Sequence, residues 1–247
     1  MALALETTMA VITLMTLLSA QVNSAPVVGT APTWQNPCGD GSSIGDATPA
    51  VWASVTSGDG THSTHYKEVS DSAIRAKRSI EDIQNLLVLK GRITTSKIEQ
   101  IKTLKLSHMP TSEALSKAKE TAHNEDSLRR ARKELAEVSV FLKHMIEEEE
   151  DVFIGQTSAS LLNEMKEFEQ KYFYGGVFCN VHHTMIATGV NHDFNFNHEG
   201  RIRDSIIDLL GNEAQRNVAY YIILRDMGNL FDFQKLEFLE LAKKNAS

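Results

Sequence analysis

The sequence predicts an all-α protein, a bundle of four or more long helices behind a flexible N-terminal lead. First, apolar residues recur at steps of three and four along most of the chain after residue 79. Second, capping residues and glycines divide that pattern into segments of helical length. Third, strand-like alternation is nearly absent, and residues 177–186 are the one ambiguous run. Amphipathic helices of this kind bury their apolar stripes against one another.

The first predicted helix begins at Ser79, where Ser79–Asp82 resembles a capping box, and it stops at Gly91. A second box at Ser96 opens a short helix that runs towards Pro110. A long helix is then predicted from about residue 112 to residue 145, with or without a break near residues 123–124. Its apolar stripe includes Leu128, Ala131, Leu135, Val138, Leu142 and Met145.

The later helices follow the same periodicity. A helix over residues 161–172 is predicted to be interrupted by Gly175 and Gly176, and residues 202–210 form a short helical segment. The closing helix, residues 217–244, is apolar over an arc too broad for a single neighbour. Such a helix belongs inside a bundle, flanked by several others.

The N-terminus predicts export. Met9–Ala20 is an apolar run of signal-peptide length that is too short to span a bilayer. We predict a signal peptide over residues 1–24, cleaved between Ser24 and Ala25, with cleavage after Ala20 as the next choice. The segment before the run carries Glu6 and no Lys or Arg, which departs from the usual pattern. The alternative is a disordered apolar tail or an uncleaved anchor. The mature chain is expected to be extracellular and to have no membrane span.

Residues 25–78 are rich in Gly, Pro, Ser, Thr and Asp, a composition that buries too little apolar surface to order itself. They are predicted to be a flexible segment, and a candidate pro-segment, before a helical-bundle domain over residues 79–247. Trp34 and Trp52 are exceptions that are expected to dock on the folded part.

Cys38 and Cys179 are the two cysteines, and an even, sparse count in an exported protein predicts a disulfide. Closing so long a loop stabilises the fold by about 4–5 kcal/mol in the chain-entropy model. Two free thiols, or a bond from Cys38 to a second chain, are the alternatives.

Two modification signals are present. Arg75, Lys77 and Arg78 precede Ser79 with the spacing that secretory-pathway convertases recognise. Cleavage after Arg78 requires an extended segment, which holds if a helix begins at Ser79 but not if it begins near residue 70. With the disulfide intact, cleavage would give a two-chain protein. Asn245 opens a glycosylation sequon at the C-terminus.

No pattern in the sequence predicts catalysis. The candidate metal ligands have no His-Glu-x-x-His spacing, and there is no nucleophile elbow or glycine-rich phosphate loop. These ligands are His182, His183, His192, Asp193, His198 and Glu199. We therefore expect no metal, no cofactor and no enzyme activity. The formal charge of −7 argues against a broad nucleic-acid surface. Residues 147–151 are interpreted as a fraying acidic helix end, and residues 129–133 as a basic surface.

The stretch over residues 219–233 resembles the last helix of long-chain four-helix-bundle cytokines, in which apolar residues lead into an exposed Arg-Asp pair. The resemblance implies receptor binding through the faces of the first and last helices, without catalysis. It also implies long crossover loops, for which residues 108–110 and 190–200 are the candidates. The side chains it suggests for a receptor face are Arg225, Asp226, Asn229 and Asp232.

The expected function is therefore that of a secreted signalling ligand, cytokine- or hormone-like, which binds a cell-surface receptor. Two other functions fit the same features. One is a secreted helical carrier of an apolar ligand, with the aromatic side chains after residue 168 lining a cavity. The other is an extracellular structural or defence protein.

Overall fold

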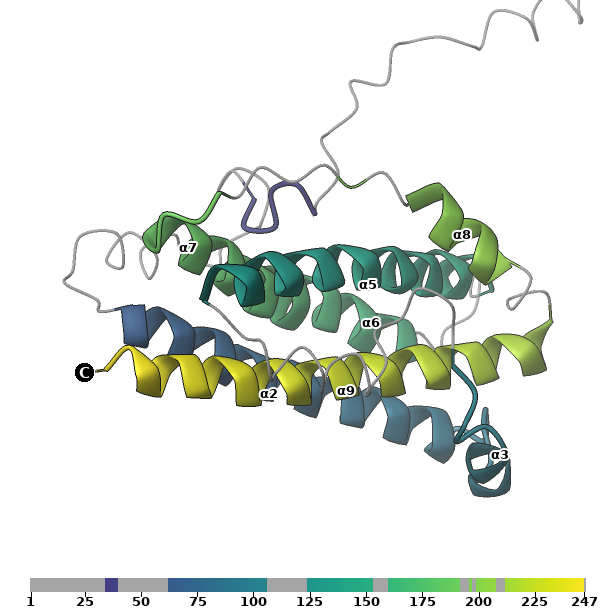
Figure 1. Cartoon of the computed structure of the whole chain (residues 1–247). Helices are drawn as coiled ribbons and strands as arrows, with labels where there is room; N and C mark the ends of the chain where they lie inside the picture. The colour runs from purple at the N-terminus through teal and green to yellow at the C-terminus, as the bar shows by residue number, and fades with distance from the viewer. Residues whose placement is uncertain are drawn as a thin grey trace, which may run out of the picture. The chain divides into compact units, whose positions relative to one another are not determined.

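The computed structural model describes residues 34–39, 62–105, 124–152, 160–191, 196, 199–207 and 212–246 (Figure 1), all within one compact unit. Helices account for nearly all of this part of the chain, and it contains no strand, so the all-α prediction is confirmed. The helices are α2 (His62–Leu89), α3 (Thr95–Gln100), α5 (Asn124–Val152), α6 (Ser160–Glu167), η2 (Phe168–Phe178), α7 (Cys179–Ala187), α8 (Glu199–Ile207) and α9 (Glu213–Lys244).

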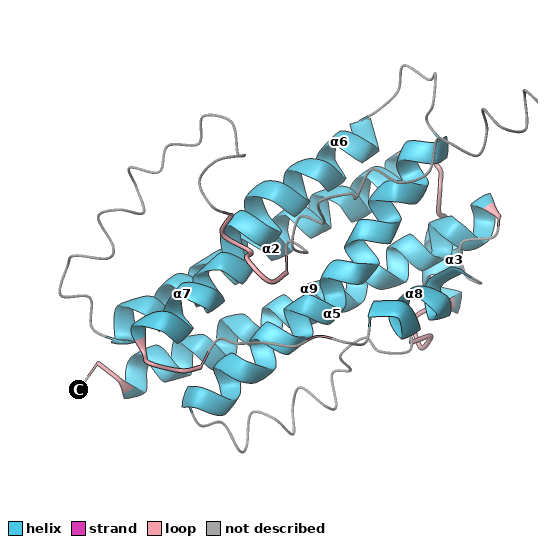
Figure 2. Ribbon diagram, turned by 90° about the horizontal axis from the view of Figure 1, so that it is seen from above, coloured by secondary structure: helices cyan, strands magenta, loops and turns pink. Residues whose placement is uncertain are grey.

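Four long helical rods form the bundle: α2, α5, the continuous rod α6–η2–α7, and α9 (Figures 1 and 2). Helices α2 and α9 are antiparallel. The hydroxyl of Ser63, at the start of α2, donates to the carbonyl of Ala242 near the end of α9 at 2.8 Å. Two turns further along α2, the hydroxyl of Ser70 donates to the carbonyl of Lys235 at 2.9 Å.

Helix α5 is antiparallel to both of its neighbouring rods. Towards α9, Ser127 bonds Glu237 at 2.7 Å, and Glu148 lies 3.9 Å from Arg216 at the opposite end. Towards the third rod, Glu150 pairs with Lys166 of α6 at 2.5 Å. Helices α2 and α5 therefore run one way, and the third rod and α9 run the other.

This up-up-down-down order requires two connections that run the length of the bundle. They are residues 90–123, which include α3, and residues 188–212, which include α8. The connection between α5 and α6, residues 153–159, joins antiparallel neighbours and is short. Of the two regions predicted to be crossovers, residues 108–110 lie outside the described residues, and residues 190–200, described in part, belong to the second long connection.

Among the four rods, α9 has the largest share of buried residues. The broad apolar arc of residues 217–244 predicted such a helix. It packs against α2 on one side and α5 on the other. The α2–α9 contact is close because small side chains lie on the facing surface of α2, and because α9 has Gly228, where a Cβ would lie 3.8 Å from Ile80. The large side chains of α9 that are fully buried include Tyr220, Ile223, Leu224, Met227, Leu230, Phe231 and Phe238.

Helix α2 begins at His62 rather than at Ser79, so residues 62–78 are not part of a flexible lead. Polar and small side chains conceal the helical pattern in this stretch. The buried face that includes Ile80 nevertheless extends back through this stretch, because Tyr66, Val69 and Ala73 are all fully buried. Burial of this face outweighs the weak helix propensity of the Ser, Thr and His residues around it.

The predicted interruption at Gly175 and Gly176 is also wrong, because the third rod passes through them as the π-helix η2. In this wider turn, a Cβ on Gly175 would lie 2.7 Å from the carbonyl oxygen of Gln170. Only glycine accommodates so close an approach. The segment also buries Phe168 and Phe178, so core packing offsets its poorer hydrogen-bond geometry.

None of the described helices is long and apolar enough to cross a membrane. The predicted signal peptide, its cleavage point between Ser24 and Ala25, and Trp52 lie outside the described residues.

Candidate functional site

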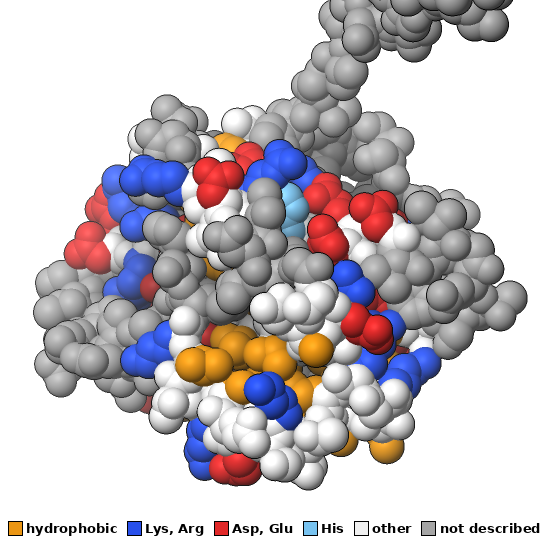
Figure 3. Space-filling model, turned by 90° about the vertical axis from the view of Figure 1, so that its right-hand side faces the viewer, with side chains coloured by type: hydrophobic (Ala, Val, Ile, Leu, Met, Phe, Trp, Pro, Cys, Tyr) orange, Lys and Arg blue, Asp and Glu red, His pale blue; other side chains and the backbone are white. Residues whose placement is uncertain are grey.

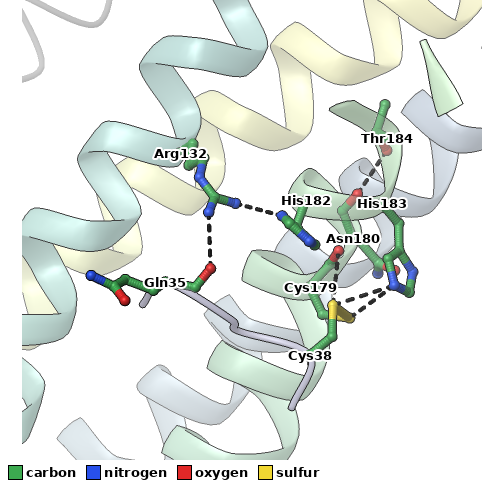
Figure 4. Close-up of a disulfide and its surroundings, with 8 residues drawn as sticks. All are labelled: Gln35, Cys38, Arg132, Cys179, Asn180, His182, His183 and Thr184. Atoms are coloured by element: carbon green, nitrogen blue, oxygen red, sulfur yellow. Dashed lines mark hydrogen bonds between the residues drawn. A yellow bond between two sulfur atoms is a disulfide. The ribbon is translucent and has the colours of Figure 1, made fainter. Parts of the chain in front are cut away.

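A disulfide ties the segment 34–39 to the third rod (Figure 4). Cys38 is bonded to Cys179, the first residue of α7, with their Cα atoms 4.9 Å apart. The intramolecular bond predicted from the two cysteines is thus present. Trp34 is buried as expected, and its ring packs edge-on against Phe196 with the centroids 5.4 Å apart. The disulfide and the indole together hold this early segment against the bundle.

Arg132 of α5 completes that attachment (Figure 4). Its guanidinium donates to the carbonyl of Gln35 at 3.2 Å and to Nδ1 of His182 at 2.7 Å. Because a guanidinium can only donate, Nδ1 of His182 is the acceptor in this contact. Arg132 is 3% exposed and lies over the Phe178 ring. The interpretation of residues 129–133 as a basic surface is therefore wrong for this residue, which has a structural role.

His183 is the other histidine of the predicted cluster that lies near the disulfide. Its Nε2 is 3.4 Å from Sγ of Cys38 and 3.8 Å from Sγ of Cys179. Burial lowers the pKa of the imidazole. The three side chains are close enough to share a metal ion, but the sulfurs are bonded to each other and provide no thiolate ligand. His192, Asp193 and His198 lie outside the described residues, and Glu199 begins α8.

The candidate convertase site lies in the interior of α2. Arg75 and Arg78 are exposed, whereas Lys77 pairs with Asp232 of α9 and lies 3.6 Å from Glu81. Ser79 is inside the helix rather than at its start. The extended conformation on which the cleavage prediction depended is therefore absent from this stretch.

The candidate receptor face on α9 is only partly an outer surface. The guanidinium of Arg225 donates to the carbonyls of Ile101, Lys102 and Leu104 at 3.0, 3.2 and 2.5 Å. Asp226 is 8% exposed and accepts from Nε of Arg225 at 2.8 Å. Burial raises the pKa of this carboxyl, although its bond to Arg225 opposes that effect. The Arg-Asp pair was expected to be exposed, but it holds the first crossover against α9.

One face of α9 is nevertheless directed outward along its whole length. Residues spaced three and four apart share a helix face, and this face divides into two halves. The first half, residues 215–225, lies beside the crossover segment 97–105. The second half is open, with Leu236 47% exposed, and we call it the α9 outer stripe. It comprises Asn229, Asp232, Leu236, Glu240 and Lys243.

A groove separates the crossover segment from the first half of that face. Its volume is about 360 Å³. Figure 3 views the end of the molecule that carries α3 and the start of α9, and it shows hydrophobic side chains gathered there with Lys or Arg among them. The lining residues are Lys97, Ile101, Leu104, Lys105, Ala214, Gln215, Val218, Ala219 and Ile222. The sequence did not predict this groove, because its signal there is limited to the apolar spacing of Ile98, Ile101 and Leu104.

Buried charges hold the ends of the bundle. Glu149 has no exposed side-chain surface; its Oε2 accepts a hydrogen bond from Arg92 at 2.9 Å, and its Oε1 lies 2.7 Å from the same nitrogen. The acidic run 147–151 is therefore not a frayed end, because α5 continues to Val152 and this carboxylate fastens the first crossover. Truncating Arg92 would leave a buried carboxylate unpaired, a change that typically costs about 3–5 kcal/mol.

The sequon residue Asn245 is the C-cap of α9. Its Nδ2 donates to the carbonyl of Leu241 at 2.8 Å, and its Oδ1 accepts from Asn124 at 3.3 Å. The amide nitrogen that would carry a glycan is thus engaged in capping the helix.

Comparison with models of known protein families, with curated proteins and with solved structures gives no match to this chain.

Proposed function

We propose that this chain is an exported, non-enzymatic signalling ligand, cytokine- or hormone-like, that binds a cell-surface receptor through helix faces. The observation that carries the proposal is the direction of the four rods. Two parallel rods followed by two that return, joined by two long crossovers, is the order typical of growth-hormone-type cytokine bundles. The disulfide supports an oxidising destination.

The receptor surface proposed here is the α9 outer stripe together with the adjoining side of α2. Leu236 is a large apolar side chain at its centre and is 47% exposed. Polar side chains surround it, and Lys77 of α2 joins the surface through Asp232. An apolar centre inside a polar rim is the arrangement in which a few residues provide most of the binding energy. Asn229 and Asp232 of the original candidate face remain in this surface, whereas Arg225 and Asp226 do not.

The test is saturable binding of the labelled, disulfide-intact protein to a panel of cell types, with unlabelled protein as competitor. Leu236→Asp is expected to weaken binding at least about tenfold, because a carboxylate would be buried without a partner at the interface. Ile186→Asp is the matched control, since Ile186 is 52% exposed but lies on α7. Equal effects of the two substitutions, or binding that never saturates, would contradict the proposal. Circular dichroism and thermal unfolding verify that both variants fold.

A further inference from the structure

We propose that the groove between residues 97–105 and the first half of α9 binds one free anionic amphiphile of the fatty-acid type. The acyl chain would lie on the apolar wall and the carboxylate beside the lysines. This inference is independent of the proposed receptor, because it uses the other half of the outward face of α9.

The walls of the groove are suited to a hydrocarbon chain. Ile101 and Ile222 are 2% and 3% exposed and form its most deeply buried lining. Leu104 also lines the groove and is 49% exposed. Ala214 and Ala219 are too small to fill the space between the crossover and the helix. A volume of about 360 Å³ lies within the usual size of small-ligand sites and holds a single molecule.

The charges of the groove select an anion. Lys97 and Lys105 are the charged side chains among the described lining residues, and no described carboxylate lines the groove. The carboxylate of Asp226, near Lys105, is bound by Arg225 and mostly buried. Among the described residues, no carboxylate in the groove balances the charge of the two lysines. A small hydrophilic anion would satisfy the lysines but leave the apolar wall in water, whereas an amphiphile satisfies both.

The groove is held in shape before any ligand arrives. Arg225 donates to three backbone carbonyls of the crossover. The backbone N–H of Ile101 caps α3 by donating to the carbonyl of Lys97 at 3.1 Å. At the start of the crossover, Arg92 is bound to the buried Glu149. Binding therefore requires little ordering of the protein, which favours affinity.

Dodecanoate, kept below its critical micelle concentration, is the probe for the test. Titration calorimetry of the full, disulfide-intact chain is expected to give one site per molecule. Leu104→Asp should weaken that binding at least about tenfold, because it places a carboxylate on the apolar wall. Leu236→Asp is the matched control, with 47% exposure against 49% for Leu104, and it should leave dodecanoate binding unchanged.

A charge-reversal pair tests the lysines separately. Replacing Lys97 and Lys105 together by Glu should weaken binding at least about tenfold, whereas the same change at Lys133 and Lys143, exposed on α5, should not. Dodecanol should bind at least about tenfold more weakly than dodecanoate, because it lacks the charge that the lysines recognise.

Four results would overturn the inference: no dodecanoate binding, equal loss in the Leu104 and Leu236 variants, equal binding of dodecanol, or binding of acidic vesicles in place of free dodecanoate. The inference and the proposed function fail separately. Leu104→Asp should keep saturable cell binding and lose dodecanoate, and Leu236→Asp should do the reverse.

Discussion

Glu134 shows how the surroundings of a single side chain change its chemistry. It faces α9 from α5, where Nε of Arg130 lies 3.8 Å from its carboxylate. The same guanidinium also pairs with the buried Glu237, so one cation serves two carboxylates. Glu137 and Lys133 act on it from its own helix with opposite signs. Burial is the largest influence and raises the pKa of Glu134 to about 8.

Because this pKa is higher in the folded protein than the ordinary value of 4.5, protonation of Glu134 favours folding. The stabilisation is complete below pH 4.5 and is lost as the pH rises through about 8. We expect this group to lower the free energy of unfolding by on the order of 1 kcal/mol per pH unit across that window. Urea unfolding at several pH values should show a flatter dependence in Glu134→Gln. Glu147→Gln, at an exposed site on the same helix, should keep the parental slope, and an unchanged slope in the Glu134 variant would contradict the assignment.

For Arg225 and Asp226, the sequence identified the residues but not the groups that they bind. Arg225 and Asp226 are adjacent on a helix whose apolar positions are obvious, so an exposed Arg-Asp pair was the natural interpretation. The carbonyls that Arg225 binds belong to the first crossover, far away in sequence. Local spacing carries no information on which loop covers which turn of a helix. The disulfide was predictable because only two cysteines were available to pair.

At the scale of the element, long and strongly periodic helices were predictable, and those that depend on tertiary burial were not. Helices α5 and α9 have apolar stripes that are sustained over many turns. The first half of α2 has Ser and Ala beside Tyr66 and Val69 on its inward face, so its helix is stabilised by close contact with α9 rather than by its own propensity. The π-helix depends on carbonyl positions that no periodicity of apolar residues reveals.

Gly175 provides the test of the π-helical segment. Gly175→Ala should destabilise the protein by about 1–3 kcal/mol, because the new methyl group would lie 2.7 Å from the carbonyl oxygen of Gln170. Gly200→Ala in α8 is the control, since a Cβ there meets nothing within 4 Å. It should be neutral or stabilise by up to about 1 kcal/mol through helix propensity. Thermal and urea unfolding measure both changes. If Gly175→Ala also proved neutral, the rod would be an ordinary α-helix at this point.

At the scale of the whole molecule, the bundle was predictable as a class but its connectivity was not. Apolar stripes predict that helices pack, and they say little about which rods run parallel. Contacts such as Ser63 with Ala242 and Glu150 with Lys166 establish which rods are antiparallel, and they join residues far apart in sequence. The broad apolar arc of α9 did predict that more than one neighbour covers it, and α2 and α5 both do.

The same arrangement predicts resistance to cleavage at Arg78. A protease needs an extended chain, but Arg75–Ser79 is in the interior of α2, and α2 is fixed to α9 along its length. A purified basic-site convertase acting on the folded protein should leave one full-length band on a reducing gel. The urea-unfolded chain, digested after dilution, should be cut there and serves as the positive control. Two disulfide-linked fragments from the folded protein would show that α2 opens at this point.

The late position of α9 in the chain also determines when the core can form during synthesis. A ribosome completes α2 long before α9, and at 5–20 residues per second the interval is roughly 8 to 30 seconds. Throughout that time Tyr66, Val69 and Ile80 have no α9 to cover them. Formation of the core is therefore concentrated in the moment when the last rod emerges from the ribosome.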